Sequence, residues 1–139
     1  MKQANHKFTI ATSGRGLQSI NREVVFWAED QGISNGLLTV YIPHTSASLV
    51  IQENADPDVL HDLNEYFNRV VSDGDPAFLH TCEGPDDMAS HIRSALTQTH
   101  LSIPVTQGKL TLGMWQGIYL FEHRTSPHKR KIILHLIGE

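Results

Sequence analysis

The sequence predicts an α+β fold, a compact antiparallel β-sandwich with helices packed against it. Two patterns lead to this prediction. Segments that alternate apolar and polar residues, or that are rich in β-branched and aromatic residues, are typical of strands and occur in both halves of the chain. Between them, apolar residues recur at helical spacing near residues 20–31 and 57–71. The predicted order is strand, helix, two strands, two helices and then four strands.

The N-terminal half begins with an alternating strand over residues 8–12 and a helix that Asn21 caps and Gly32 ends. Two buried strands follow, over residues 37–42 and 47–51. Asp56 then caps a second helix, with Pro57 at its first position. These signals place polar residues at strand ends and at helix starts.

The C-terminal half begins with a short helix that Asp86 or Asp87 can cap. Strands are predicted over residues 101–105 and 110–114, which form a hairpin, and over residues 117–121 and 131–137. The apolar residues of this half, such as Leu112, Met114, Ile118 and Leu120, are more than one small domain is expected to cover.

The totals favour one domain spanning residues 1–139. A formal net charge of −4 argues against binding nucleic acid through a general basic face. No apolar run is long enough for a membrane helix, and the first residues do not resemble a signal peptide. A single cysteine cannot form an intrachain disulfide, so we expect a cytoplasmic protein.

The segment from His80 to Ile92 is the richest in chemistry. Its histidines and carboxylates can ligate a divalent metal or transfer a proton near neutral pH. We predict His80, His91 and the strand-end His44 as metal ligands, with an open position for water or substrate. Glu83 is the first candidate for proton transfer, and Asp86 is the second candidate catalytic carboxylate or a helix cap.

Two further polar clusters are expected to join this segment in one cleft and to bind substrate: Thr45, Glu53 and Asn54 upstream, and Gln116, Glu122, Arg124 and Arg130 downstream. The basic segment around Arg124 and Arg130 is either a solvated strand end or an anion site, since arginine binds phosphate bidentately. Cys82 is either a small buried residue or a nucleophile.

Several of these motifs together, in one order, resemble the YjbQ family, also called secondary thiamine-phosphate synthases. The resemblance rests on residues 43–49 (PHTSASL), 52–59 (QENADPDV), 80–92 (HTCEGPDDMASHI), 115–120 (WQGIYL) and 122–124 (EHR). It covers nearly the whole chain. One departure is Asp87, which stands where the family commonly has asparagine and adds a carboxylate beside Asp86.

The resemblance implies a YjbQ-like α+β fold, a homotrimer, and metal-binding histidines near the subunit interface. It also implies thiamine phosphate synthase-like activity, which joins hydroxymethylpyrimidine diphosphate to thiazole phosphate. A divalent ion, zinc or magnesium, and basic residues that hold phosphates suit that reaction. The residues themselves leave two alternatives open: a non-catalytic protein that binds a metal or small ligand, and a metal-dependent hydrolase of a small phosphorylated metabolite.

Overall fold

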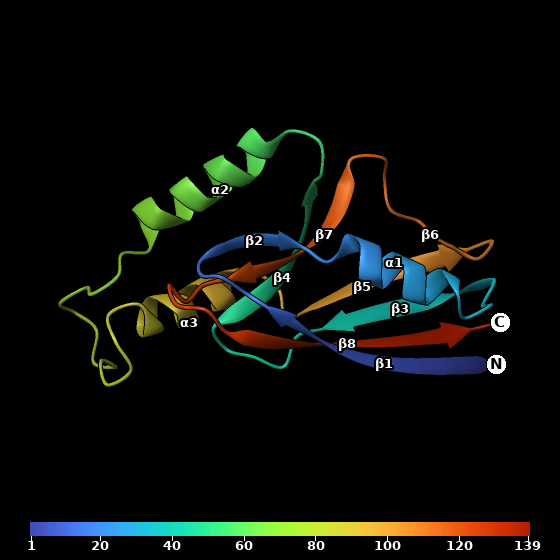
Figure 1. Cartoon of the computed structure of the whole chain (residues 1–139), viewed down its shortest axis with the longest axis horizontal. Helices are drawn as coiled ribbons and strands as arrows, with labels where there is room; N and C mark the ends of the chain where they lie inside the picture. The colour runs from blue at the N-terminus through green and yellow to red at the C-terminus, as the bar shows by residue number, and fades with distance from the viewer.

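Two antiparallel sheets form the framework of the protein, in a computed structural model that describes residues 1–139. The five-stranded sheet has the order β1 (Lys2–Ala11), β8 (Lys129–Gly138), β3 (Asn35–Tyr41), β5 (His100–Thr106) and β6 (Lys109–Leu110). The three-stranded sheet has the order β2 (Gly16–Ser19), β7 (Gln116–Glu122) and β4 (Ala47–Glu53). Together with three helices, this arrangement confirms the predicted α+β class (Figure 1).

The core lies between the inward faces of the two sheets, as the alternation of each strand dictates. Leu38, Leu134 and Leu136 of the large sheet are fully buried, and Leu49 and Leu120 meet them from the small sheet. The small sheet is also bonded to the segment just before β5, because the amide of Leu49 donates to the carbonyl of Gln98 at 2.7 Å. Because the core between the sheets is apolar, polar residues lie at the strand ends, where the candidate site is found.

Helix α1 (Asn21–Glu29) covers one edge of the core with Val24 and Ala28. Asn21 does not cap it: Ile20 occupies the N-cap position, and the Asn21 side chain instead accepts a hydrogen bond from the amide of Ile118 at 3.1 Å. Gly32 follows the helix with φ of 68°, a left-handed conformation that glycine adopts without strain. The helix was therefore predicted correctly, but not its cap.

Helix α2 (Pro57–Val70) stands apart from the sheets in Figure 1, and none of its residues is buried. Asp56 caps it as predicted, accepting a hydrogen bond from the amide of Asp58 at 2.9 Å. Buried Arg93 donates to the carbonyl of Val71 at 2.9 Å, where the helix dipole favours a cation. The C-terminal end of α2 is thus attached to the body of the protein.

Helix α3 (Asp87–Leu96) contains Asp87 and His91 of the His80–Ile92 segment and is attached to the three-stranded sheet. The hydroxyl of Ser90 donates to the carbonyl of His123 at 2.7 Å, and that of Ser94 donates to the carbonyl of Ala47 at 3.3 Å. The side chains at the start of α3 are therefore held against the ends of β4 and β7.

Three details differ from the sequence-based expectations. Strand β2 was not predicted, because it has only four residues, begins at Gly16 and comes shortly after Gly14. The hairpin partner of β5 ends at Leu110, since Pro104 has no N–H to continue the ladder. Ile118 and Leu120, expected to be uncovered, are completely buried, whereas Met114 is 80% exposed. No helix combines the length and the apolar character needed to span a membrane.

Candidate metal centre

Three side chains converge at the start of α3: His80, Asp87 and His91. Their ligand atoms all lie within 4.8 Å of one another. One oxygen of Asp87, Oδ2, lies 2.7 Å from Nε2 of His80 and 3.1 Å from Nε2 of His91. The Asp87 side chain is 3% exposed, whereas those of His80 and His91 are 43% and 32% exposed. A buried carboxylate therefore faces two imidazoles that solvent can reach.

The local sequence explains how these groups meet. Asp87 and His91 are four residues apart on α3, a spacing that places both on the same face of a helix. His80 comes back to this face because the chain turns at Gly84, which has φ of 105°. The other carboxylate oxygen of Asp87, Oδ1, accepts a hydrogen bond from Nη1 of Arg124 at 2.9 Å, and this bond fixes the orientation of the carboxylate.

The proton on His91 can be placed from its hydrogen bonds. Nδ1 lies 3.0 Å from the carbonyl oxygen of Thr45, which only accepts, so Nδ1 carries hydrogen and donates. In the neutral ring, Nε2 then presents a lone pair to Oδ2 of Asp87. Burial raises the pKa of Asp87, but hydrogen bonding to His80 and the charges of His91 and Arg124 outweigh it and lower this pKa. When His91 is neutral, two lone pairs face each other, and a metal ion ligated by both atoms, or a proton on Nε2, relieves the repulsion.

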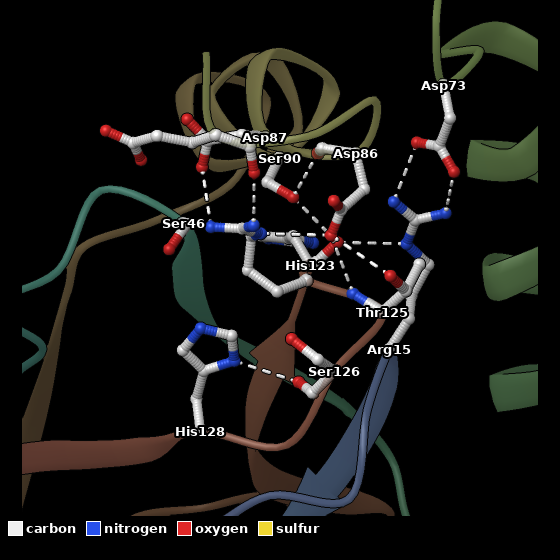
Figure 2. Close-up of polar contacts among 12 residues, drawn as sticks. Arg15, Ser46, Asp73, Asp86, Asp87, Ser90, His123, Thr125, Ser126 and His128 are labelled. Carbon is white, nitrogen blue, oxygen red and sulfur yellow. Dashed lines mark hydrogen bonds and ion pairs between the residues drawn. The ribbon is translucent and has the colours of Figure 1, made fainter. Parts of the chain in front are cut away.

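Asp86 lies next to this cluster but is held by other partners. It occupies the N-cap position of α3 without making a side-chain capping bond, contrary to the expected role. Its Oδ2 accepts from Nε of Arg124 and from the amide of Thr125, both at 2.9 Å. Burial raises the pKa of Asp86, but these bonds outweigh it and lower the pKa to about 2. Figure 2 shows this carboxylate beside Thr125 and His123.

Arg124 is consequently not available for a phosphate in the way that the sequence suggested. Its Nε and Nη1 bind Asp86 and Asp87, and Nη2 donates to the carbonyl of Glu83 at 2.9 Å. A guanidinium that is already paired with two carboxylates acts as a support for them. All three guanidinium nitrogens of Arg124 thus have partners within the chain, and its expected substrate-binding role stays a prediction.

His44 is not part of the cluster. Its Nε2 accepts a hydrogen bond from the amide of Lys131 at 2.9 Å, on the far side of the turn that contains Thr45. Two of the three histidines predicted as ligands thus come together within the chain, and Asp87 stands where His44 was expected. Sequence reasoning treated Asp87 as a cap or an extra charge, although its spacing from His91 was a usable signal.

Glu122 and Arg130 form a buried ion pair close to the cluster. Nε of Arg130 donates to Glu122 at 2.8 Å, and the hydroxyl of Thr12 donates to the same oxygen at 2.7 Å. Burial raises the pKa of Glu122, but the bonds from Arg130 and Thr12 lower it further than burial raises it. Glu122 is 1% exposed, so it supports Arg130 and does not contact a ligand directly.

The other predicted substrate-binding residues, Glu53, Asn54 and Gln116, lie at the opposite end of the small sheet. Glu53 pairs with Gln116 where Ala47 pairs with Glu122 at the near end. Six residues of extended strand separate these pairs by about 20 Å. Both Asn54 and Gln116 hold the turn that precedes β7. The Gln116 side chain accepts from the amide of Gly113 at 2.7 Å, and the Asn54 side chain donates to the carbonyl of Gln116 at 3.3 Å. The expected single cleft is therefore wrong in this part.

Glu83 and Cys82 are both exposed, which contradicts the expectation of a buried cysteine beside the candidate base. Both residues lie in the turn that precedes α3, where the backbone runs along the surface. Only the backbone of Glu83 is bound, through its carbonyl to Arg124. The side chain of Glu83 is free in solvent, so its predicted proton-transfer role gains no support from burial.

The chain is similar to proteins of one known family along nearly its whole length. Residues 6–139 match the family described as UPF0047 protein YjbQ-like. The chain belongs to the YjbQ/UPF0047 family. A UPF0047 protein from Synechocystis is 48% identical over 99% of this chain and 94% of its own length. UPF0047 protein YjbQ from Escherichia coli O157:H7 is 42% identical over 94% of the chain and 95% of its own.

Solved structures agree with this membership. A hypothetical protein from Aeropyrum pernix K1 has a TM-score of 0.89 and 31% identity, covering 98% of this chain and 99% of its own. A YjbQ/UPF0047 protein from Clostridium acetobutylicum has a TM-score of 0.87 and 33% identity, covering 95% and 99%. Both the family resemblance and the YjbQ-like fold predicted from the sequence are confirmed.

The activity expected from the resemblance needs correction. The relatives are named only as UPF0047 proteins, and a similar structure from Sulfolobus solfataricus P2 is described as a protein of unknown function. Nothing in these relatives indicates thiamine phosphate synthase activity, so that assignment is wrong. Family membership by itself supports no reaction.

Proposed function

We propose that the YjbQ/UPF0047 chain binds a divalent transition-metal ion through His80, Asp87 and His91. The observation that carries the proposal is the contact between Nε2 of His91 and Oδ2 of Asp87, 3.1 Å apart, with the other ring nitrogen committed to the carbonyl of Thr45. A cation between the two atoms resolves a contact that is otherwise repulsive. The Thr45 carbonyl is also the kind of outer partner that metal-bound histidines use.

The donor set fits the ion. Two imidazoles and one carboxylate suit first-row transition metals, whereas magnesium prefers oxygen ligands. Ligand atoms about 2.1 Å from a tetrahedral ion lie roughly 3.4 Å apart. The two contacts of Asp87 Oδ2, at 2.7 and 3.1 Å, need only small adjustments to reach that separation. Of the two ions expected from the sequence, zinc is therefore favoured over magnesium.

Three protein ligands leave a position for an exchangeable ligand, as sites that act on small molecules do. The exposed faces of His80 and His91 make that position reachable from solvent. A surface cavity of about 380 Å³ also lies beside His80, lined by Asp75, Phe78 and Thr81 among others. When bound, the ion supplies Lewis acidity. Arg124 meanwhile holds Asp87, and the Thr45 carbonyl holds the proton of His91 on Nδ1.

The test is metal binding by chain that has been stripped with a chelating resin and then given Zn²⁺ or Co²⁺. We expect roughly one ion per chain by elemental analysis, and a Co²⁺ absorption spectrum of low coordination number. Asp87→Asn and His91→Gln should each weaken binding by more than about 100-fold, because even outer partners cost 10–100-fold. His61→Gln is the matched control, since His61 is 70% exposed on α2.

Circular dichroism of each variant separates lost binding from lost folding. A wild-type chain that takes up less than about a tenth of an equivalent of either metal would overturn the proposal. In that case an ordinary hydrogen bond accounts for the contact between His91 and Asp87.

A further inference from the structure

A second cavity lies on the other side of Thr45, away from the metal centre. Its volume is about 520 Å³, within the range of small-molecule sites. Eight residues line it, none of them acidic: Tyr41, Ile42, Pro43, His44, Thr45, Ser46, Thr99 and Arg130. Every polar side chain in this set can donate a hydrogen bond.

Arg130 provides the decisive observation. It is only 4% exposed, yet it lines the cavity. Nε donates to Glu122, and Nη2 donates to Glu122, to the carbonyl of Ser46 at 3.1 Å and to the hydroxyl oxygen of Ser46 at 2.9 Å. These bonds leave Nη1 as the guanidinium nitrogen without a partner in the chain. A buried guanidinium with a free N–H group at a cavity is a typical feature of an oxyanion site.

The histidine at this cavity also presents a donor. Nε2 of His44 accepts from the amide of Lys131, so the ring proton lies on Nδ1. Burial and the positive charge of Arg130 lower the pKa of His44, and they outweigh the charge of Glu122, which raises it. His44 is therefore a fixed N–H donor in a positive field.

Hydroxyl groups complete the set. The Ser46 oxygen accepts from Arg130, which leaves the Ser46 hydrogen free to donate. Thr45 and Thr99, whose hydroxyls can also donate, are among the residues that line the same cavity. The carboxylate of Glu122 offsets the charge of Arg130, but Glu122 is not among the residues that line the cavity.

We propose that this cavity, formed by His44, Thr45, Ser46, Thr99 and Arg130, binds the oxyanion group of a small ligand, a carboxylate or a phosphate. The inference goes beyond the metal centre and does not require the ion. The two sites share one residue, because Thr45 is among the residues that line the cavity and accepts from His91 with its carbonyl.

The experiment uses the full chain after metal removal, at about pH 7 and constant ionic strength. Inorganic phosphate and acetate are titrated separately, followed by calorimetry and by amide chemical shifts. We expect saturable binding at about millimolar concentration for at least one anion, with shifts at residues 44–46 and 99. The anion that binds roughly tenfold more tightly identifies the ligand class. Binding that persists without metal shows that the site is separate from the metal centre.

Thr45→Val combined with Thr99→Val should weaken anion binding roughly tenfold or more, because both hydroxyl groups are lost. Thr106→Val is the control, since Thr106 is exposed at the end of β5. Arg130→Lys is a harsher variant that disturbs the buried ion pair, so the conclusion rests on the threonines. The proposal is overturned if neither anion saturates by about 50 mM, or if the double variant binds as wild type does.

Discussion

Arg124 and Asp87 are joined by a 2.9 Å hydrogen bond from Nη1 to Oδ1, which turns the other Asp87 oxygen toward His80 and His91. Arg124 thus holds the carboxylate on one side while the imidazoles meet it on the other. We expect Arg124→Gln to weaken Zn²⁺ binding by about 10- to 100-fold, as the loss of outer partners does. Competition with a chromogenic chelator measures this. Arg22→Gln, on the surface of α1, should change nothing, and a folded Arg124→Gln chain with wild-type affinity would refute the positioning role.

Asp86 should govern part of the acid stability. Its pKa falls from the ordinary 3.8 to about 2 in the folded chain. The contribution is present above about pH 4 and is lost as the pH falls through about 2, because the unfolded chain takes up the proton first. We expect it to amount to roughly 2 kcal/mol. Urea unfolding across this range should show the decrease in wild type, and Asp86→Asn should lack that component.

His123 should govern stability at mildly acidic pH. It is completely buried, and its Nε2 lies 2.8 Å from the hydroxyl of Ser48. Burial, together with the charge of Arg93, lowers its pKa from 6.5 to about 3. Between these values the unfolded chain binds a proton that the folded chain does not, so stability falls as the pH drops from about 6.5. Unfolding free energies of His123→Gln should depend less on pH in this window, whereas His61→Gln should keep the wild-type slope.

Glu83 offers a test of the exposed turn before α3. Its side chain is exposed and only its carbonyl is bound, so Glu83→Gln should change the unfolding free energy by less than about 0.5 kcal/mol. The metal content should also stay the same, because the proposed ligands are elsewhere. Loss of metal in this variant, measured by elemental analysis, would make Glu83 a ligand.

Self-association remains a prediction. The structure offers a different surface for it from the one that the sequence suggested, because Ile118 and Leu120 are buried. On the outer face of the large sheet, Leu37 pairs with Ile137 and Tyr41 pairs with Ile133. Leu37 and Tyr41 are each 43% exposed, although both are large apolar residues on a sheet. We expect light scattering to give the mass of a trimer, and Leu37→Glu to shift it toward the monomer. A wild-type monomer at micromolar concentration would contradict the expectation.

The sequence by itself determined the local features of this protein. Alternation defined most strands because side chains of a strand point to opposite faces, and the Asp56-Pro57 pair set the start of α2. It also placed His91 and Asp87 on one turn of helix, although that signal was not used. These are properties of neighbouring residues, so their spacing along the chain is enough to predict them.

Only the tertiary structure decided which distant groups meet. His44 and His80 both make polar contacts, but with different partners. Strand pairing places His44 where it accepts from the amide of Lys131, whereas the turn at Gly84 places His80 against Asp87. Glu53 and Glu122, both expected in one cleft, lie at opposite ends of the small sheet because β4 and β7 are extended and run antiparallel. Strand register and loop direction depend on how the whole core packs, and no local spacing encodes them.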